Sequence, residues 1–145
     1  MMKQLLRSAP AWSAAVLVTT ALASIVQSWQ VQSRLTRLGV EISPSLAAET
    51  AWRDFAGLAL PLLLVFGLAL LLGFALAGWL RVRLPLLAPL AWPLAGIGAV
   101  AATLSLMKVA MDITPLAGAR GLDGFLLFCL AGALGGLVYA WLRPQ

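Results

Sequence analysis

Four long stretches of the chain are built almost entirely from apolar residues. They run over 10–29, 55–80, 86–107 and 124–142. Each matches or exceeds the roughly 20 residues that a helix needs to cross the hydrocarbon core of a bilayer. Their apolar residues fall on every face, whereas the strands of a membrane barrel alternate apolar and polar positions. The pattern predicts an all-α membrane protein with four transmembrane helices, in a single integral membrane domain covering 1–145.

The start of the chain has a second interpretation. Lys3 and Arg7 precede the first apolar stretch, as the basic residues of a cleavable secretory signal do. The stretch is longer than the apolar region of a typical signal, so we expect an uncleaved signal anchor that forms the first span.

The two halves of the chain share a pattern. Hairpin 1 covers about 10–83 and hairpin 2 about 86–143. Each begins with Ala-Trp, turns at an acidic residue followed by a Ser-Pro or Thr-Pro pair, and ends on Trp-Leu-Arg, at 79–81 and at 141–143. Because each unit contains two spans, the copies would share one orientation in the membrane. This predicts two tandem helical hairpins in a parallel pseudo-repeat.

The connections between the spans carry helix signals of their own. Apolar positions at helical spacing continue after residue 29, so we expect the first span to extend as an amphipathic helix until Gly39, which suits a helix stop. Ser43 before Pro44 and Thr114 before Pro115 are typical of an N-cap followed by proline at the first helical position. Each hairpin should therefore carry a short amphipathic helix on the periplasmic side.

Composition excludes a soluble protein. Hydrophobic residues make up 62% of the chain and charged residues 10%, with a mean hydropathy of +0.98. Soluble globular domains carry roughly a quarter charged residues, and disordered chains carry far less apolar surface. The bias toward Arg over Lys and toward Ala and Leu suggests a bacterial protein of the inner membrane.

Charge distribution predicts the orientation. The net charge is +5. One side of the four-span topology holds five basic residues and no carboxylate: Lys3, Arg7, Arg81, Arg83 and Arg143. The other side also holds five basic residues, but all five carboxylates balance them. Counted by Lys and Arg alone the two sides tie. We place both termini in the cytoplasm because the basic residues on that side are unpaired and adjoin the span ends.

Tryptophans mark the expected membrane edges, because amphipathic rings favour the headgroup level. The expected cytoplasmic belt contains Trp12, Trp79, Trp92 and Trp141, and the outer belt contains Trp29 and Trp52.

Candidate chemistry is sparse. The chain has no histidine and one cysteine, Cys129, so no metal site, cofactor or intramolecular disulfide is expected. No ionisable residue lies near the middle of a span, which argues against a proton-coupled transporter. The sequence also lacks the Gly-rich loop of nucleotide sites and the nucleophile elbow. We expect no catalytic residues, no enzymatic activity and no nucleic-acid partner.

The charged residues on the outer side form the candidate site. It is a polar or lipid-headgroup-binding cluster of Arg53, Asp54, Lys108, Asp112, Arg120 and Asp123. Helical spacing predicts ion pairs of Arg53 with Glu49, of Lys108 with Asp112 and of Arg120 with Asp123. Lys108 is the strongest single candidate, because it could reach a lipid phosphate from just inside the membrane edge. The alternative is that these groups only solvate the ends of packed helices.

Small and hydroxyl residues inside the spans leave two further questions. Gly132 and Gly136 permit a close helix contact, either within the bundle, which we favour, or in a dimer. Hydroxyl side chains of the first and third spans could line a polar seam or bond back to their own helices. They are Thr19, Thr20, Ser24, Thr103 and Ser105.

Three classes of function remain. The leading hypothesis is a small inner-membrane protein that acts by binding, either as an accessory or assembly subunit of a membrane complex or as a self-associating bundle. Its partners would be the lipid bilayer and a protein partner or further copies of the chain. The second is a small channel or facilitator with its pathway at the repeat axis. The third is a lipid-active enzyme that uses carboxylates on the periplasmic side.

Overall fold

The computed structural model describes residues 2–112 and 116–143. Its four long helices are α1 (Met2–Arg37), α2 (Pro44–Arg83), α3 (Ala91–Met111) and α4 (Leu122–Leu142). Two short 3-10 turns, η1 (Pro85–Leu87) and η2 (Ala117–Ala119), precede α3 and α4. Each long helix has the length and apolar composition to cross a membrane. The expectation of an all-α protein with four such helices is confirmed.

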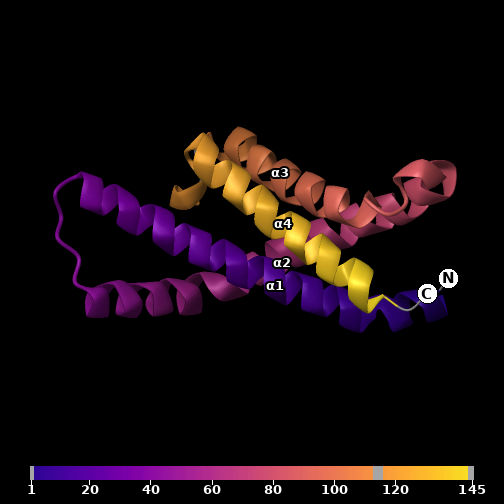
Figure 1. Cartoon of the computed structure of the whole chain (residues 1–145), viewed down its shortest axis with the longest axis horizontal. Coiled ribbons are helices and arrows are strands. Elements are labelled where there is room, and N and C mark those ends of the chain that lie inside the picture. The colour runs from indigo at the N-terminus through magenta and orange to yellow at the C-terminus, as the bar shows by residue number, and fades with distance from the viewer. Residues whose placement is uncertain (1, 113–115, 144–145) are drawn as a thin grey trace.

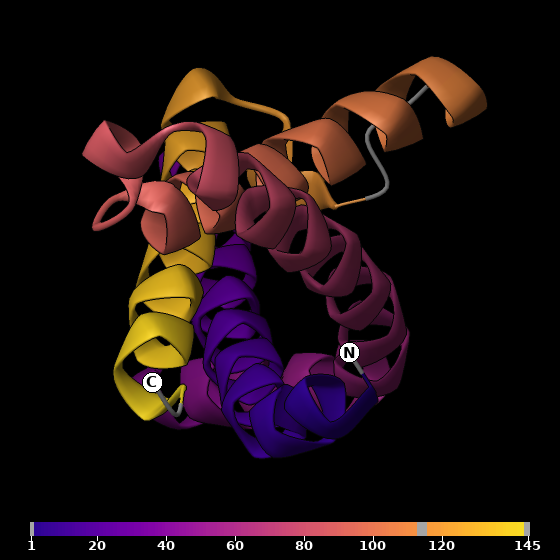
Figure 2. The ribbon, with the colours of Figure 1, turned by 90° about the vertical axis from the view of Figure 1, so that its right-hand side faces the viewer.

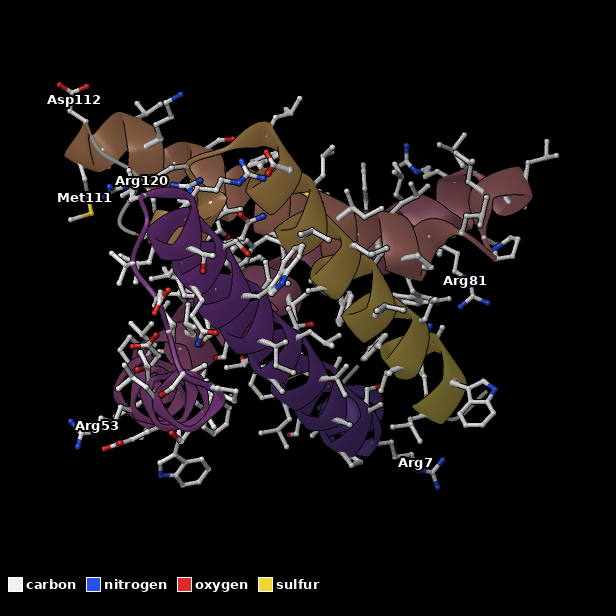
Figure 3. All side chains as sticks on the ribbon, turned by 60° about the vertical axis from the view of Figure 1, so that its left-hand side comes forward. Arg7, Arg53, Arg81, Met111, Asp112 and Arg120 are labelled. Carbon is white, nitrogen blue, oxygen red and sulfur yellow. The ribbon has the colours of Figure 1, made fainter. Side chains whose placement is uncertain are left out.

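The helices of the first half are much longer than those of the second. α1 has 36 residues and α2 has 40, whereas α3 and α4 have 21 each. At 1.5 Å per residue the first two are about 54 and 60 Å long, well beyond a hydrocarbon core of about 30 Å. Figures 1 and 3 show that the two halves of α2 run in different directions, and Pro61 lies inside this helix. A proline within a helix removes a backbone hydrogen bond and favours such a bend.

The third helix begins later than the hydrophobic pattern predicts. The apolar stretch starts at residue 86, but residues 85–87 form a 3-10 turn and α3 begins at Ala91. Pro89 explains the delay, because it has no backbone N–H and cannot donate the hydrogen bond to Pro85 O that would continue a helix through this segment. Pro93 is tolerated in the first turn of α3, where the missing N–H would have no partner within the helix.

Gly39 ends α1 as expected. Its φ of +81° is left-handed, a region that glycine adopts without strain. The backbone N–H of Val40 donates to Leu35 O at 3.1 Å, and that of Gly39 donates to Thr36 O at 3.0 Å. This pair of bonds is the Schellman motif, which satisfies the last carbonyl groups of a helix.

Ser43 caps the start of α2, also as expected. Its hydroxyl accepts a hydrogen bond from the N–H of Leu46 at 3.3 Å, and Pro44 takes the first helical position. The helix then continues unbroken to Arg83, so the short helix expected after Ser43 is not a separate element. In the second half, η2 is a single 3-10 turn. The Thr114–Pro115 cap lies outside the described residues.

The four helices pack in a ring. α1 lies against α2 and α4, and α3 lies against α4 and α2. Figure 1 shows α4 crossing in front of the bundle, and Figure 2 shows the last turns of α3 projecting beyond the other helices. Consistent with that view, no α3 residue after Leu104 is buried, nor any α2 residue before Leu62. The bundle is therefore well packed over only part of its length.

Glycines set the closest helix contacts. A Cβ atom added at Gly96 of α3 would lie 2.7 Å from the carbonyl carbon of Gly132 on α4. One added at Gly136 would lie 2.7 Å from the carbonyl carbon of Trp92. Each position allows the α3 and α4 backbones to touch, which is how small residues drive helix association in membranes. The expectation that Gly132 and Gly136 pack the bundle is confirmed.

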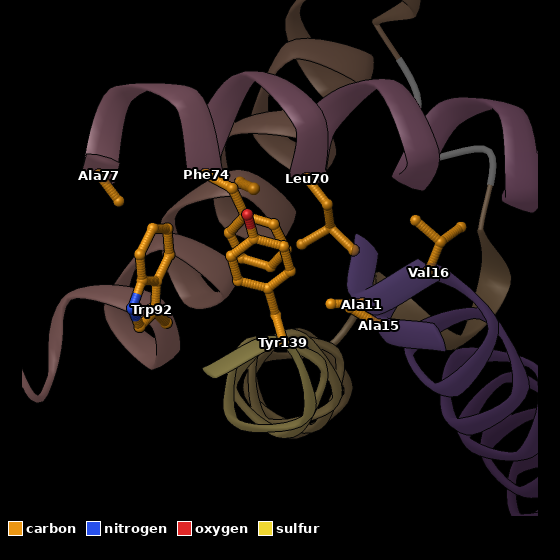
Figure 4. Close-up of a cluster of buried hydrophobic side chains, with 9 residues drawn as sticks. Ala11, Ala15, Val16, Leu70, Phe74, Ala77, Trp92 and Tyr139 are labelled. Atoms are coloured by element: carbon orange, nitrogen blue, oxygen red, sulfur yellow. The ribbon is translucent and has the colours of Figure 1, made fainter. Parts of the chain in front are cut away.

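Aromatic rings fill the core between α2, α3 and α4 (Figure 4). Phe74 stacks on Tyr139 with ring centroids 4.2 Å apart, and Trp92 meets Tyr139 edge-on at 4.9 Å. Trp92 is therefore a buried core residue. Trp12 is half-buried and donates from Nε1 to Gly67 O at 3.3 Å. Both were expected in the cytoplasmic belt. Trp92 lies near the start of α3, but its ring packs inside the bundle instead of facing lipid.

Candidate functional site

The six residues of the predicted cluster lie on four separate segments. Figure 3 shows Arg53, Asp112 and Arg120 toward one end of the molecule and Arg7 and Arg81 toward the other. The set comprises Arg53 and Asp54 in the first half of α2, Lys108 and Asp112 at the end of α3, Arg120 after η2, and Asp123 in the first turn of α4. These residues share an end of the bundle but not a single pocket.

Arg53 pairs within its own helix. Its Nη2 lies 2.7 Å from Glu49 Oε1, which confirms the pair predicted from i, i+4 spacing. The two side chains are 77% and 56% exposed. Exposed pairs of this kind typically stabilise a protein by less than about 1 kcal/mol. This pair therefore solvates the start of α2, in agreement with the alternative interpretation of the cluster.

Lys108 and Asp112 do not pair, although both belong to the part of the chain that the structure describes. Asp112 caps the end of α3 with φ of 53° and ψ of 9°, a left-handed conformation that Asp tolerates better than most side chains. This turn takes Asp112 out of helical register with Lys108. Lys108 is exposed on the projecting end of α3, between Leu106 and Val109, which are 67% and 82% exposed.

A basic residue outside the predicted cluster, Arg34 of α1, lies near the start of α4. A Cβ atom added at Gly121 would be 3.0 Å from Asp123 Oδ1 and 3.2 Å from Arg34 Nη2. Gly121 thus leaves room for both charged groups beside the backbone. Sequence reasoning missed Arg34, because nothing in the local pattern places the end of α1 against the start of α4. Arg120, one residue before Gly121, is exposed.

A row of polar residues on α1 points into the bundle. Six of them are at most 7% exposed: Thr19, Thr20, Ser24, Gln27, Ser28 and Gln30. Gln27 holds the turn η2 in front of α4, since its Oε1 accepts a hydrogen bond from the backbone N–H of Gly118 at 2.8 Å. The hydroxyl oxygens of Thr19, Thr20 and Ser24 are buried and have no hydrogen-bond partner among the described residues.

Of the two alternatives for the span hydroxyls, Thr103 follows the second and bonds back to its own helix. Thr103 Oγ1 donates to Ala99 O of its own helix at 2.7 Å, and Thr103 lines an outer groove rather than the interior. Ser24 and Ser28 instead line a small cavity of about 330 Å³ between α1 and the first half of α2. Its lining residues carry no charge.

A groove of about 480 Å³ lies between α2 and α3. Its walls are apolar, and Arg81 is the one charged residue among the described residues that line it. The guanidinium carbon of Arg81 lies 5.9 Å from the centre of the Trp92 ring, and that of Arg143 lies 4.7 Å from it. Sequence reasoning missed this arrangement, although the repeated Trp-Leu-Arg motif supplies both arginines.

Within 2–112 and 116–143, no three His, Cys, Asp or Glu side chains gather into a group that could hold a metal ion. Cys129 is buried in α4. Comparison of the chain with protein-family models, with curated proteins and with solved structures gives no match.

Proposed function

We propose that this small polytopic membrane protein acts by binding, as an accessory or assembly subunit of a membrane complex. The observation that carries the proposal is the end of α3. Beyond Leu104 the helix leaves the bundle, and every described residue from 105 to 112 is at least partly exposed. An apolar helix end that lacks a neighbour in its own chain offers a surface for a helix of another membrane protein.

Lys108 gives this surface a preference for a negatively charged partner. It lies inside the apolar helix α3 and has no ion-pair partner among the described residues. Charged residues within membrane helices normally pair with an opposite charge. A partner helix that presents a carboxylate near the membrane edge would satisfy Lys108 and cover Leu106 and Val109.

The proposed orientation places both termini in the cytoplasm of a bacterium, with the protein in the inner membrane. The distribution of charge along the bundle supports this orientation. Arg7 and Arg81 lie toward one end of the molecule, whereas Arg53, Asp112 and Arg120 lie toward the other (Figure 3). The parallel repeat of two hairpins remains part of this proposal, as do amphipathic segments on the periplasmic side. The channel and enzyme hypotheses gain no support, since Thr103 faces the outer groove and the carboxylates are not gathered.

The test is native mass spectrometry of the tagged full-length chain, extracted in mild detergent from its own membrane. We expect a stoichiometric complex that is lost on Lys108→Gln. Arg53→Gln is the matched control, because it removes an exposed cation at the same end of the molecule and should leave the complex intact. A mass equal to two copies would identify the partner as the chain itself.

A crosslinking measurement locates the contact. In a Cys129→Ala background, a thiol-reactive photo-crosslinker at Val109→Cys should capture the partner. The same probe at Leu126→Cys of α4, which is 58% exposed, should not. Recovery of wild-type protein only as a free monomer, or equal capture from both positions, would refute the proposal.

A further inference from the structure

The groove between α2 and α3 has a floor of small residues and a rim of leucines. A Cβ atom added at Gly73 would lie 3.0 Å from Ala99 Cβ, so the two helices touch at the floor. Leu72 and Leu76 of α2 and Leu94 of α3 form the rim and are 50% to 63% exposed. The small floor and tall rim leave a channel along the outside of the bundle, open to the surrounding hydrocarbon.

The groove has the length of a lipid chain. Its lining runs from Ala69 on α2 to Leu84, the residue after that helix, and from Ala91 to Leu106 on α3. At 1.5 Å per residue, each wall is about 22 Å long. One leaflet contributes about 15 Å to a hydrocarbon core of about 30 Å. An extended acyl chain from one leaflet therefore fits within the groove.

The groove suits a narrow apolar occupant. Its walls come from two helices that touch at Gly73 and Ala99, and its lining is almost entirely apolar. The one hydroxyl among the described lining residues, that of Thr103, is already bonded to Ala99 O. A hydrocarbon chain needs no polar contact along such walls.

The end of the groove near Arg81 is cationic. Arg81 lines the groove, and its guanidinium carbon lies 5.9 Å from the centre of the Trp92 ring. The guanidinium carbon of Arg143, at the end of α4, lies 4.7 Å from the centre of the same ring. Arg83 lies nearby in sequence, over Trp79 at 5.0 Å. All five carboxylates of the sequence belong to the α1–α2 connection, the start of α2, the end of α3 or the start of α4, which is the other end of the bundle.

Neither guanidinium group has an Asp or Glu partner among the described residues, so both are available to a bound anion. Arginine matches a phosphate group particularly well, because its planar fork donates two parallel hydrogen bonds. The groove thus presents apolar walls of acyl-chain length and a phosphate-binding pair at the headgroup level.

We propose that the groove between α2 and α3 binds an anionic phospholipid, with one acyl chain along Gly73 and Ala99 and the phosphate held by Arg81 and Arg143. Leu106 belongs both to this groove and to the proposed protein-binding end of α3. The charged groups of the two proposals, Arg81 and Lys108, lie near opposite ends of the bundle, so either proposal can fail without the other. The repeated Trp-Leu-Arg motif acquires a role here, because its two copies supply the two arginines.

The test uses native mass spectrometry of the full-length protein in mild detergent, with phosphatidylglycerol and phosphatidylcholine of identical acyl chains added in competition. We expect retention of one phosphatidylglycerol with a preference of at least about tenfold, the effect of a charge-assisted hydrogen bond. In the Arg81→Gln/Arg143→Gln double variant the preference should fall to within about twofold, whereas Arg53→Gln at the far end should leave it unchanged.

A groove-filling variant tests the acyl-chain site. Gly98 lines the groove, and a Cβ atom added there would meet nothing within 4 Å, so Gly98→Leu fills the groove without disturbing a helix contact. It should lower the retention of both lipids about tenfold. Gly57→Leu, at an equally open position of α2 that does not line the groove, is the matched control.

The detergent unfolding midpoint of each variant shows that the protein is folded, so that loss of lipid reports on the site. Equal retention of the two lipids by the wild type would overturn the preference for an anionic headgroup. An unchanged preference in the double arginine variant would overturn the assignment of that headgroup to Arg81 and Arg143. Unchanged retention in Gly98→Leu would overturn the assignment of the acyl chain to the groove.

Discussion

The contact between α3 and α4 yields the sharpest prediction, through the substitution Gly96→Ala. The added methyl group would lie 2.7 Å from the carbonyl carbon of Gly132 and 3.4 Å from the N atom of Ala133. Carbon atoms in contact are normally about 3.5–4.0 Å apart. Because the obstructing atoms are backbone, no side-chain rotation can relieve the overlap, and the two helices must separate by about 1 Å.

The expected cost follows from that separation. A gap of 0.5–1 Å forfeits roughly a quarter to a half of the dispersion energy of each contact pair, and forcing extra atoms into a packed core typically costs about 1–3 kcal/mol. In the bilayer no hydrophobic driving force between helices compensates, because lipid is as apolar as the helix surface. We therefore expect Gly96→Ala to lower the free energy of unfolding by about 1–3 kcal/mol.

Gly98→Ala is the matched control. It lies two residues away in the same helix, but a methyl group there would meet nothing within 4 Å. Removing glycine from a helix interior should leave stability unchanged or raise it by about 0.5–1 kcal/mol. Both variants are compared with wild type by titrating SDS into protein in mild detergent and following helicity by circular dichroism. Equal unfolding midpoints for the two variants would show that α3 and α4 do not meet through Gly96.

Three further predictions concern single interactions. Gly39→Ala should cost about 1–2 kcal/mol, because an L side chain is strained at a φ of +81°, and Gly39→Asn should cost less; the unfolding midpoint measures both, and equal losses would contradict this account. Gln27→Leu should lower stability by about 1–3 kcal/mol and speed hydrogen exchange at Gly118, whose buried N–H loses its acceptor; unchanged exchange there would argue against the bond. Arg53→Gln should change stability by at most about 0.5 kcal/mol, since its pair with Glu49 is exposed, and a larger loss would mean that Arg53 has a further partner.

The candidate cluster shows where sequence reasoning reached its limit. The Glu49–Arg53 pair follows from regular helical spacing alone, and it forms. The same rule predicted a pair of Lys108 with Asp112, yet the chain turns left-handed at Asp112 and the pair is lost. The i, i+4 rule predicts a contact between two side chains only if both residues belong to one regular helix. The groove with Arg81 and Arg143 combines residues 62 positions apart in the sequence, so no local pattern could have identified it.

The sequence by itself determined the elements that depend on local chemistry. Length and apolar composition fixed the four long helices, Gly39 fixed the end of α1, and the Ser43–Pro44 pair fixed the start of α2. Each of these signals acts over a few neighbouring residues: the hydrocarbon thickness a helix must cross, a positive φ, or one side-chain hydrogen bond. They could be recognised without knowing any tertiary contact.

The tertiary structure alone decided which faces of the helices meet. Trp92 is buried while Trp79 is 58% exposed, although both looked like residues of the membrane edge. In a soluble protein a polar face would have marked the outside of each helix. Here lipid and neighbouring helices are equally apolar, so the hydrophobic pattern does not distinguish the lipid-facing side of a helix from the side that faces another helix. Close packing at glycines such as Gly96 and Gly132 selects the contacts instead, and it depends on the shapes of both partners.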